Sequence, residues 1–81
     1  MKSLELLNFE GPVLIAEQTE LGTYLIFDQW KNAVNELSRN ELIQFFDGNF
    51  EIEDSSGKFW NWSIEHDDAK PSIERIDEFL N

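Results

Sequence analysis

The residues with the most obvious chemical potential lie in the polar segment His66-Asp67-Asp68, which holds the only histidine of the chain. An imidazole beside carboxylates can act as a general base or bind a metal ion. A zinc site, however, normally needs three or four well-spaced ligands, often with more than one His or Cys. Because this chain has no cysteine and one histidine, we interpret the segment as a solvated turn.

Other catalytic arrangements have even less support. Oxygen-bearing side chains alternate from Asp47 to Glu53, but this segment lacks the full spacing and final Glu of a calcium-binding loop. The four glycines form no phosphate-binding loop, and no serine elbow accompanies His66. Acid–base catalysis by two carboxylates that converge in a cleft remains an alternative, although 81 residues leave little volume for a cleft. The sequence therefore predicts no catalytic, metal-binding or cofactor-binding residue and argues against an enzyme.

A binding face is the better candidate. In the segment from Phe50 to Trp62, the two-residue period of a strand places Phe59 on the same face as acidic and polar side chains. If this face is wet, a lone aromatic ring among carboxylates suits a basic partner whose side chains have apolar stems. The alternative is that the N-terminal segment or the last helix covers Phe59. The predicted partner-binding residues are Glu51, Glu53, Phe59, Asn61 and Glu65.

The net charge of −11 is the strongest compositional signal, with 17 acidic residues against six Lys and Arg. Residues 50–81 alone carry nine acidic side chains against Lys58, Lys70 and Arg75. Such a field repels phosphate backbones and anionic membranes and attracts basic proteins. We therefore expect a basic protein partner, no nucleic acid and no membrane. The alternative is that the acidity only keeps a small protein in solution.

The length and composition predict one folded domain over residues 1–81. A chain this small has a thin margin of stability, but aromatic residues, at 14% of the chain, can build most of a small core. The absence of cysteine excludes disulfides. The N-terminus lacks the apolar region of a signal peptide, and no apolar run is long enough to span a bilayer. A cytoplasmic location is the default expectation.

Two strands are predicted early in the chain. PVLIAEQ (12–18) and TYLIFD (23–28) each contain four consecutive apolar residues, which is typical of strands that are covered on both faces or central in a sheet. Residues 1–9 fit a short strand or a helical turn equally poorly.

Three helices are predicted. With Asp28 as N-cap, Trp30, Ala33, Val34 and Leu37 recur at helical spacing and predict a helix over 29–37. Ser38 and Glu41 match a capping box, which predicts a second helix ending at Gly48; a single bent helix over 29–47 is the alternative. Ser72 is the predicted N-cap of a last helix, and its apolar stripe comprises Ile73, Ile76, Phe79 and Leu80.

A hairpin is predicted in residues 50–65. The segment Asp54–Lys58 suits a three-residue loop in which Gly57 takes the left-handed conformation. This register places Ile52 opposite Trp60 and Phe50 opposite Trp62. One face then holds Phe50, Ile52, Trp60, Trp62 and Ile64, and the other holds Glu51, Glu53, Phe59, Asn61, Ser63 and Glu65.

The predicted fold is α+β in the order β-β-α-α-β-β-α, with an antiparallel sheet of about four strands in two hairpins and two or three helices mainly on one face. The leading functional prediction is a small acidic protein-interaction module, in its sharpest form an inhibitor of a basic active site. One alternative is a small-molecule binding domain with an aromatic-lined pocket between sheet and helices. Another is a structural or oligomerising domain. A monomer is favoured, with a dimer left open.

Overall fold

The chain folds into six strands and two α-helices, and the computed structural model describes residues 2–81. The first four strands are β1 (Ser3–Asn8), β2 (Pro12–Gln18), β3 (Tyr24–Asp28) and β4 (Ala33–Leu37). They are followed by α1 (Arg39–Phe46), β5 (Glu51–Glu53) and β6 (Phe59–Asn61). Two single-turn 3₁₀ helices, η1 (Trp62–Ile64) and η2 (Asp67–Ala69), then lead to α2 (Ile73–Leu80).

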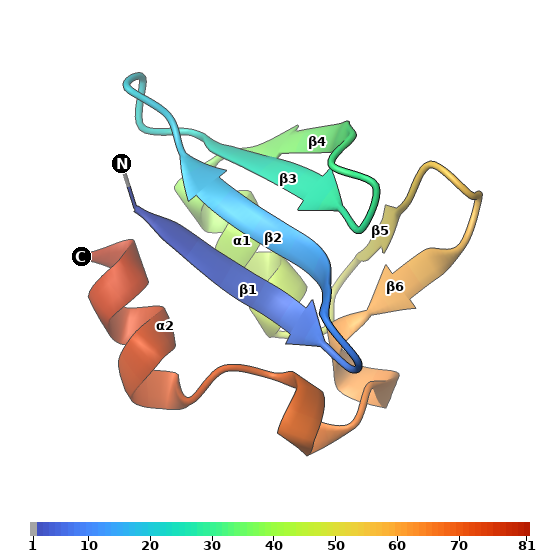
Figure 1. The fold of residues 1–81 in the computed structure, drawn as a ribbon. Helices are drawn as coiled ribbons and strands as arrows, with labels where there is room; N and C mark the ends of the chain where they lie inside the picture. Colours follow the sequence, from blue (N-terminus) through green and yellow to red (C-terminus); the bar gives the residue numbers. More distant parts are fainter. Residues whose placement is uncertain (1) are drawn as a thin grey trace.

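The strands form two antiparallel sheets. The first four strands make a four-stranded sheet in the order β1-β2-β3-β4, and β5 pairs with β6 in a separate two-stranded sheet. Figure 1 shows α1 behind the larger sheet and α2 beside β1, with the β5–β6 hairpin at the opposite end. The predicted α+β class is therefore confirmed, although the larger sheet is built from residues 3–37 and not from two separated hairpins.

The hydrophobic core lies between one face of the larger sheet and the helices. Leu6, Leu14 and Ile26 of the sheet are fully buried, as are Leu42 and Phe45 of α1. The helix α2 contributes Phe79, whose ring centroid lies 5.3 Å from that of Tyr24 on β3. Both helices therefore cover the same face of the sheet, as predicted.

The two apolar runs form β2 and β3, which are the central strands of the larger sheet, so the prediction of strands central in a sheet is confirmed. Residues 3–8, which the sequence left ambiguous, form the edge strand β1. The burial of β2 and β3 alternates, with Leu14, Ala16, Tyr24 and Ile26 buried and the residues between them only partly so. One face of these strands is thus not covered by the described chain.

The predicted helix over 29–37 is wrong, because residues 33–37 form β4. Asp28 does accept a hydrogen bond from the backbone N–H of Trp30, as an N-cap would, but it also binds the N–H of Asn32. Lys31 then takes a left-handed φ of 65°, which ends any helical turn. The chain reverses and pairs with β3, so a tertiary contact overrides a short helical pattern, and Trp30 is left 53% exposed.

The other helix signals are correct. Ser38 and Glu41 form the predicted capping box, with hydrogen bonds of 3.1 and 2.8 Å, so α1 starts separately and no single bent helix forms. Gly48 follows α1 with a φ of 77°. Ser72 caps α2 through the N–H of Arg75. The predicted stripe of α2 is wrong at Ile73, which is 74% exposed because it lies in the first turn, ahead of the residues that reach the core.

The hairpin register is confirmed where the strands pair. Ile52 lies opposite Trp60, and Gly57 has a φ of 87° in the loop. The pairing ends at Asn61, so Phe50 and Trp62 do not face each other as strand partners, although both rings contact Phe45. The prediction for Ile64 is wrong: η1 turns the chain away, and this side chain is 76% exposed.

No helix within residues 2–81 has both the length and the apolar character that crossing a membrane requires.

Candidate functional site

Two buried carboxylates fix the loops at the hairpin end of the molecule. Asp28, after β3, accepts hydrogen bonds from the backbone N–H and the hydroxyl of Ser55 in the β5–β6 loop. Asn32 adds a 3.1 Å bond from its amide to the same hydroxyl. The β3–β4 loop and the hairpin loop are therefore joined through side chains.

Asp54 organises the hairpin loop itself. One carboxylate oxygen accepts bonds from Ser56 and from the N–H of Lys58, and the other accepts the indole N–H of Trp60 at 2.9 Å. Burial raises the pKa of Asp54, but these hydrogen bonds outweigh burial and lower the pKa to about 2. Burial likewise raises the pKa of Asp28, and its bonds from Ser55, Asn32 and Trp30 lower it overall. Both groups are structural anions.

Four of the five predicted binding residues lie together on the outer side of the β5–β6 hairpin. Glu51 pairs with Asn61, and Glu53 pairs with Phe59. Phe59 is 56% exposed, and both glutamates are exposed as well. The structure thus places an exposed aromatic ring beside two carboxylates, here called the hairpin face.

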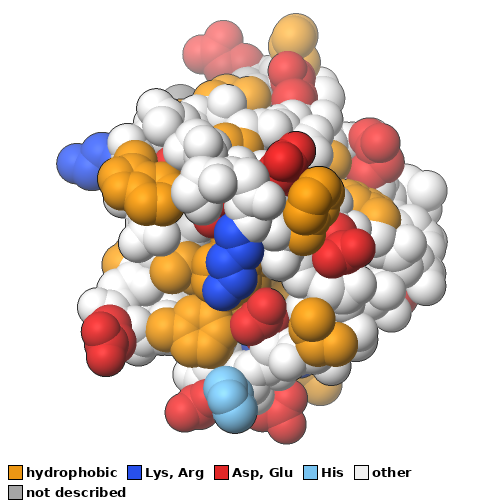
Figure 2. All heavy atoms as spheres, turned by 90° about the vertical axis from the view of Figure 1, so that its right-hand side faces the viewer, with side chains coloured by type: hydrophobic (Ala, Val, Ile, Leu, Met, Phe, Trp, Pro, Cys, Tyr) orange, Lys and Arg blue, Asp and Glu red, His pale blue; other side chains and the backbone are white. Residues whose placement is uncertain are grey.

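Glu65, the fifth predicted residue, lies elsewhere. It lines an open groove of about 1080 Å³ between the β1–β2 turn and the segment that follows β6. Figure 2 shows this side of the molecule, where hydrophobic, acidic and basic side chains adjoin one another. The groove is lined by Asn8, Phe9, Glu10, Gly11, Pro12, Val13, Gln29, Lys58, Trp60, Glu65, His66, Asp68 and Ala69.

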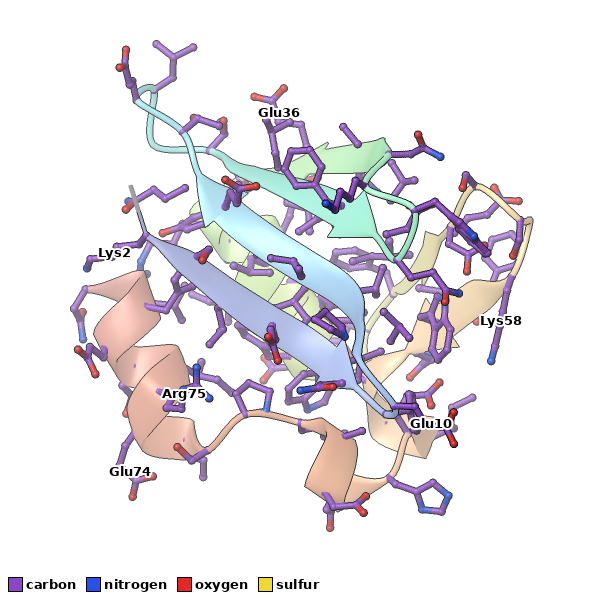
Figure 3. The ribbon with its side chains drawn as sticks, in the orientation of Figure 1. Lys2, Glu10, Glu36, Lys58, Glu74 and Arg75 are labelled. Carbon is purple, nitrogen blue, oxygen red and sulfur yellow. The ribbon has the colours of Figure 1, made fainter. Side chains whose placement is uncertain are left out.

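The floor of the groove is aromatic. The rings of Phe9 and Trp60 are 5.7 Å apart, and the ammonium group of Lys58 lies 3.7 Å from the centroid of the Trp60 ring. This is a cation–π contact, which favours a positive charge on the ring face. Figure 3 shows Glu10 at the β1–β2 turn and Lys58 on the hairpin, on the same side of the molecule.

A second candidate surface is the uncovered face of the larger sheet. Ile15 pairs with Phe27 across β2 and β3, and Leu25 on β3 lies on the same side. All three side chains are partly exposed. Figure 1 shows this side of the sheet toward the viewer, with no other element of the described chain in front of it.

Carboxylates surround this apolar centre. Glu5 pairs with Ile15, Glu17 pairs with Leu25, and Leu25 pairs in turn with Glu36 on β4. The carboxylate of Glu36 accepts a 2.7 Å hydrogen bond from the hydroxyl of Thr23 and remains exposed. None of the strand residues on this side is basic. We call the apolar residues together with Glu5, Glu17 and Glu36 the open sheet face.

The sequence reasoning missed the open sheet face, although its signal was present. The segments 12–18 and 23–28 each contain four consecutive apolar residues, as expected for strands covered on both sides. Within the part of the chain that the structure describes, helices cover one side of these strands and leave the other side open. The surplus apolar residues on the other side are the signal that could have located a binding surface.

The segment around His66 forms η2 and the turn before it, with His66, Asp67 and Asp68 all exposed. Within residues 2–81 no three side chains of His, Asp or Glu are grouped so that they could hold a metal ion.

Comparison of this chain with protein-family models, with curated proteins and with solved structures finds no match.

Proposed function

We propose that this chain is a small, non-catalytic interaction module that binds a basic protein partner through its open sheet face. The observation that carries the proposal is the apolar centre of that face, in particular Ile15, Leu25 and Phe27, which no element of the described chain covers. Burying partly exposed apolar side chains on association contributes roughly 25 cal/mol per Å². A partner would therefore gain affinity at this centre.

The carboxylates around the centre support a basic partner. Glu5, Glu17 and Glu36 lie beside apolar residues and form no ion pair; the single ion pair of the described chain joins Lys70 and Asp67. Lys and Arg side chains could lay their apolar stems along Ile15 and Phe27 and place their charges against these carboxylates. Such complementarity speeds association and selects the partner.

A second copy of the chain is a poorer occupant. Face-to-face pairing would bring the same three carboxylates of each copy toward one another, and like charges at an interface are unfavourable. The net charge of −11 on each copy adds repulsion. The proposal therefore includes a monomeric chain that joins a different protein.

Acids elsewhere are scattered over all the elements, for example Glu41 on α1 and Glu74 on α2. This distribution favours a localised interface with an apolar centre over a continuous mimic of a nucleic-acid backbone. The hairpin face, with Phe59, Glu51 and Glu53, is kept as a predicted second contact surface for the same partner.

The proposal of a non-catalytic chain is supported by the structural role of the two acids whose pKa values are shifted. Asp28 and Asp54 have lowered pKa values and are occupied by loop hydrogen bonds, whereas a general acid or base needs a pKa near the working pH. The alternative of an aromatic-lined pocket between sheet and helices is less well supported, because Phe45 there packs against Phe46, Phe50 and Trp62.

The test is affinity capture from native lysate with the wild-type chain and with Ile15→Lys, followed by identification of the proteins that rising salt releases. We expect a basic protein that binds the wild type and is lost with Ile15→Lys. Leu21→Lys is the matched control, because Leu21 is 89% exposed in the β2–β3 turn and its replacement adds the same charge. Circular dichroism checks that each variant is folded, and Ile15→Thr serves if Ile15→Lys is not.

Retention of the same protein by Ile15→Lys and Ile15→Thr, or equal loss with Leu21→Lys, would contradict the proposal. Phe59→Ala in the same assay decides whether the hairpin face belongs to the interface.

A further inference from the structure

The groove beside the hairpin is continuous with the open sheet face. Val13, two residues before Ile15 on β2, packs partly against the core and also lines the groove. Gln29, which follows β3 opposite the same end of β2, lines it too. A partner that covers Ile15 and Phe27 is thus placed to extend a side chain or a short segment toward Trp60.

The groove already holds a positive charge on its aromatic floor. The Lys58 ammonium lies 3.7 Å from the Trp60 ring centroid and has no carboxylate within ion-pair distance among the described residues. Trp60 itself is fixed independently of that ammonium, by its bond to Asp54 and by contact with Phe9. The ring would therefore keep its position if the Lys58 side chain moved away.

The carboxylates of the groove are not neutralised by this one lysine. Glu10, Glu65 and Asp68 line the groove, and none of them forms an ion pair in the described chain. Three carboxylates and one ammonium group thus line the groove. The groove is therefore complementary to additional cationic groups.

We infer that the groove receives a basic side chain of the partner, which replaces Lys58 over the Trp60 ring. This inference rests on the proposed function and specifies it, since it names an arginine or lysine next to the partner's apolar contact. The planar guanidinium of Arg suits the ring face especially well, because it stacks on aromatic rings and is less strongly hydrated than an ammonium.

Lys58 can leave without loss of the hairpin. Its backbone N–H is held by Asp54 at 3.1 Å, and its backbone C=O accepts the N–H of Asp54 at 2.9 Å. Its side chain is exposed, and among residues 2–81 its ammonium group interacts with the Trp60 ring alone. In the free chain Lys58 thus shields Trp60, which is 5% exposed, and competes with the incoming cation.

The experiment titrates the ¹⁵N-labelled full chain with the peptide acetyl-Ala-Arg-Arg-Ala-amide and observes the backbone amide and indole N–H signals by NMR. Trp30→Phe and Trp62→Phe assign the Trp60 signal by elimination. We expect saturable shifts at Trp60 and Phe9 with the arginine peptide and none with acetyl-Ala-Gln-Gln-Ala-amide.

The decisive variant is Lys58→Met, which keeps an apolar stem and removes the competing ammonium. We expect it to bind the arginine peptide about two- to fivefold more tightly, the ratio that corresponds to loss of one exposed cation–π contact. Lys70→Met is the matched control, because the Lys70 ammonium lies 5.0 Å from the Trp62 ring, outside the groove. Lys58→Gln provides the same test if Lys58→Met is poorly folded.

Unchanged affinity in both Lys58 variants, or shifts confined to Ile15 and Leu25, would overturn the groove inference and leave the proposed function standing. Failure of the proposed function would instead be seen in the capture assay, which compares variants of Ile15 and Leu21 and leaves the groove residues unchanged.

Discussion

At the scale of single residues, Asp54 is the most consequential side chain of the hairpin. It is 5% exposed and accepts bonds from a hydroxyl, two backbone N–H groups and an indole N–H. Both carboxylate oxygens of Asp54 accept hydrogen bonds. In Asp54→Asn the side-chain NH₂ group replaces one of these oxygens and therefore faces another donor. We expect the free energy of unfolding to fall by about 1–3 kcal/mol.

Urea denaturation measures this change, and Glu53→Gln, an exposed neighbour in the same hairpin, is the control with little expected effect. A variant Asp54→Asn as stable as the wild type would show that the indole and loop bonds contribute nothing net.

The pH dependence follows from the same residue. The pKa of Asp54 falls from 3.8 to about 2 on folding, so the unfolded chain binds more protons in that range. The stabilisation by the ionised carboxylate is fully present above pH 3.8 and is lost as the pH falls through about 2. We therefore expect the stability difference between wild type and Asp54→Asn to shrink between pH 5 and about 2.

The wild type and Asp54→Asn are compared because low pH also reduces the repulsion among the other carboxylates, and it does so in both proteins. A difference that stays constant over this pH range in urea titrations would contradict the lowered pKa.

At the scale of elements, the segment 29–37 gives the clearest test of the fold. Lys31 has a left-handed φ of 65° in the β3–β4 loop, a conformation that costs a non-glycine residue about 1–2 kcal/mol. We expect Lys31→Gly to raise the free energy of unfolding by about 1 kcal/mol. If these residues formed the helix that the apolar spacing suggests, the same change would lower it by a similar amount, about 1 kcal/mol.

Thermal or urea denaturation shows whether Lys31→Gly raises or lowers the free energy of unfolding. Lys31→Ala is the control, since alanine keeps the Cβ atom and should bring no comparable gain.

Signals that act within a few residues predicted the structure well. The capping box of Ser38, the N-cap Ser72 and the loop around Gly57 are determined by local hydrogen bonds and backbone angles, and all three are found. The hairpin register followed from the same loop.

Features that depend on distant contacts could not be predicted in this way. The spacing of Trp30, Ala33 and Val34 is helical, but pairing with β3 decides their structure. For the candidate sites, alternation correctly grouped Phe59 with Glu51 and Glu53, whereas η1 redirected the chain and moved Glu65 to the groove. The open sheet face required knowledge of which side the helices cover.

At the scale of the whole molecule, the central question is whether the negative charge only keeps the chain in solution or binds a partner at one surface. We propose that Glu5, Glu17 and Glu36, around the apolar centre of the open sheet face, carry the binding role. If acidity served only to keep the chain in solution, any three exposed acids would be equivalent. Two variants with the same change in net charge therefore separate the two explanations.

The measurement that tests this most directly compares two triple variants in the capture assay across a salt series. One replaces the rim of the open sheet face (Glu5→Gln, Glu17→Gln, Glu36→Gln), and the other replaces exposed acids of α2 (Glu74→Gln, Asp77→Asn, Glu78→Gln). We predict that the rim variant loses the basic partner and much of the salt dependence, while the α2 variant retains both. Equal behaviour of the two variants would contradict a localised acidic binding face.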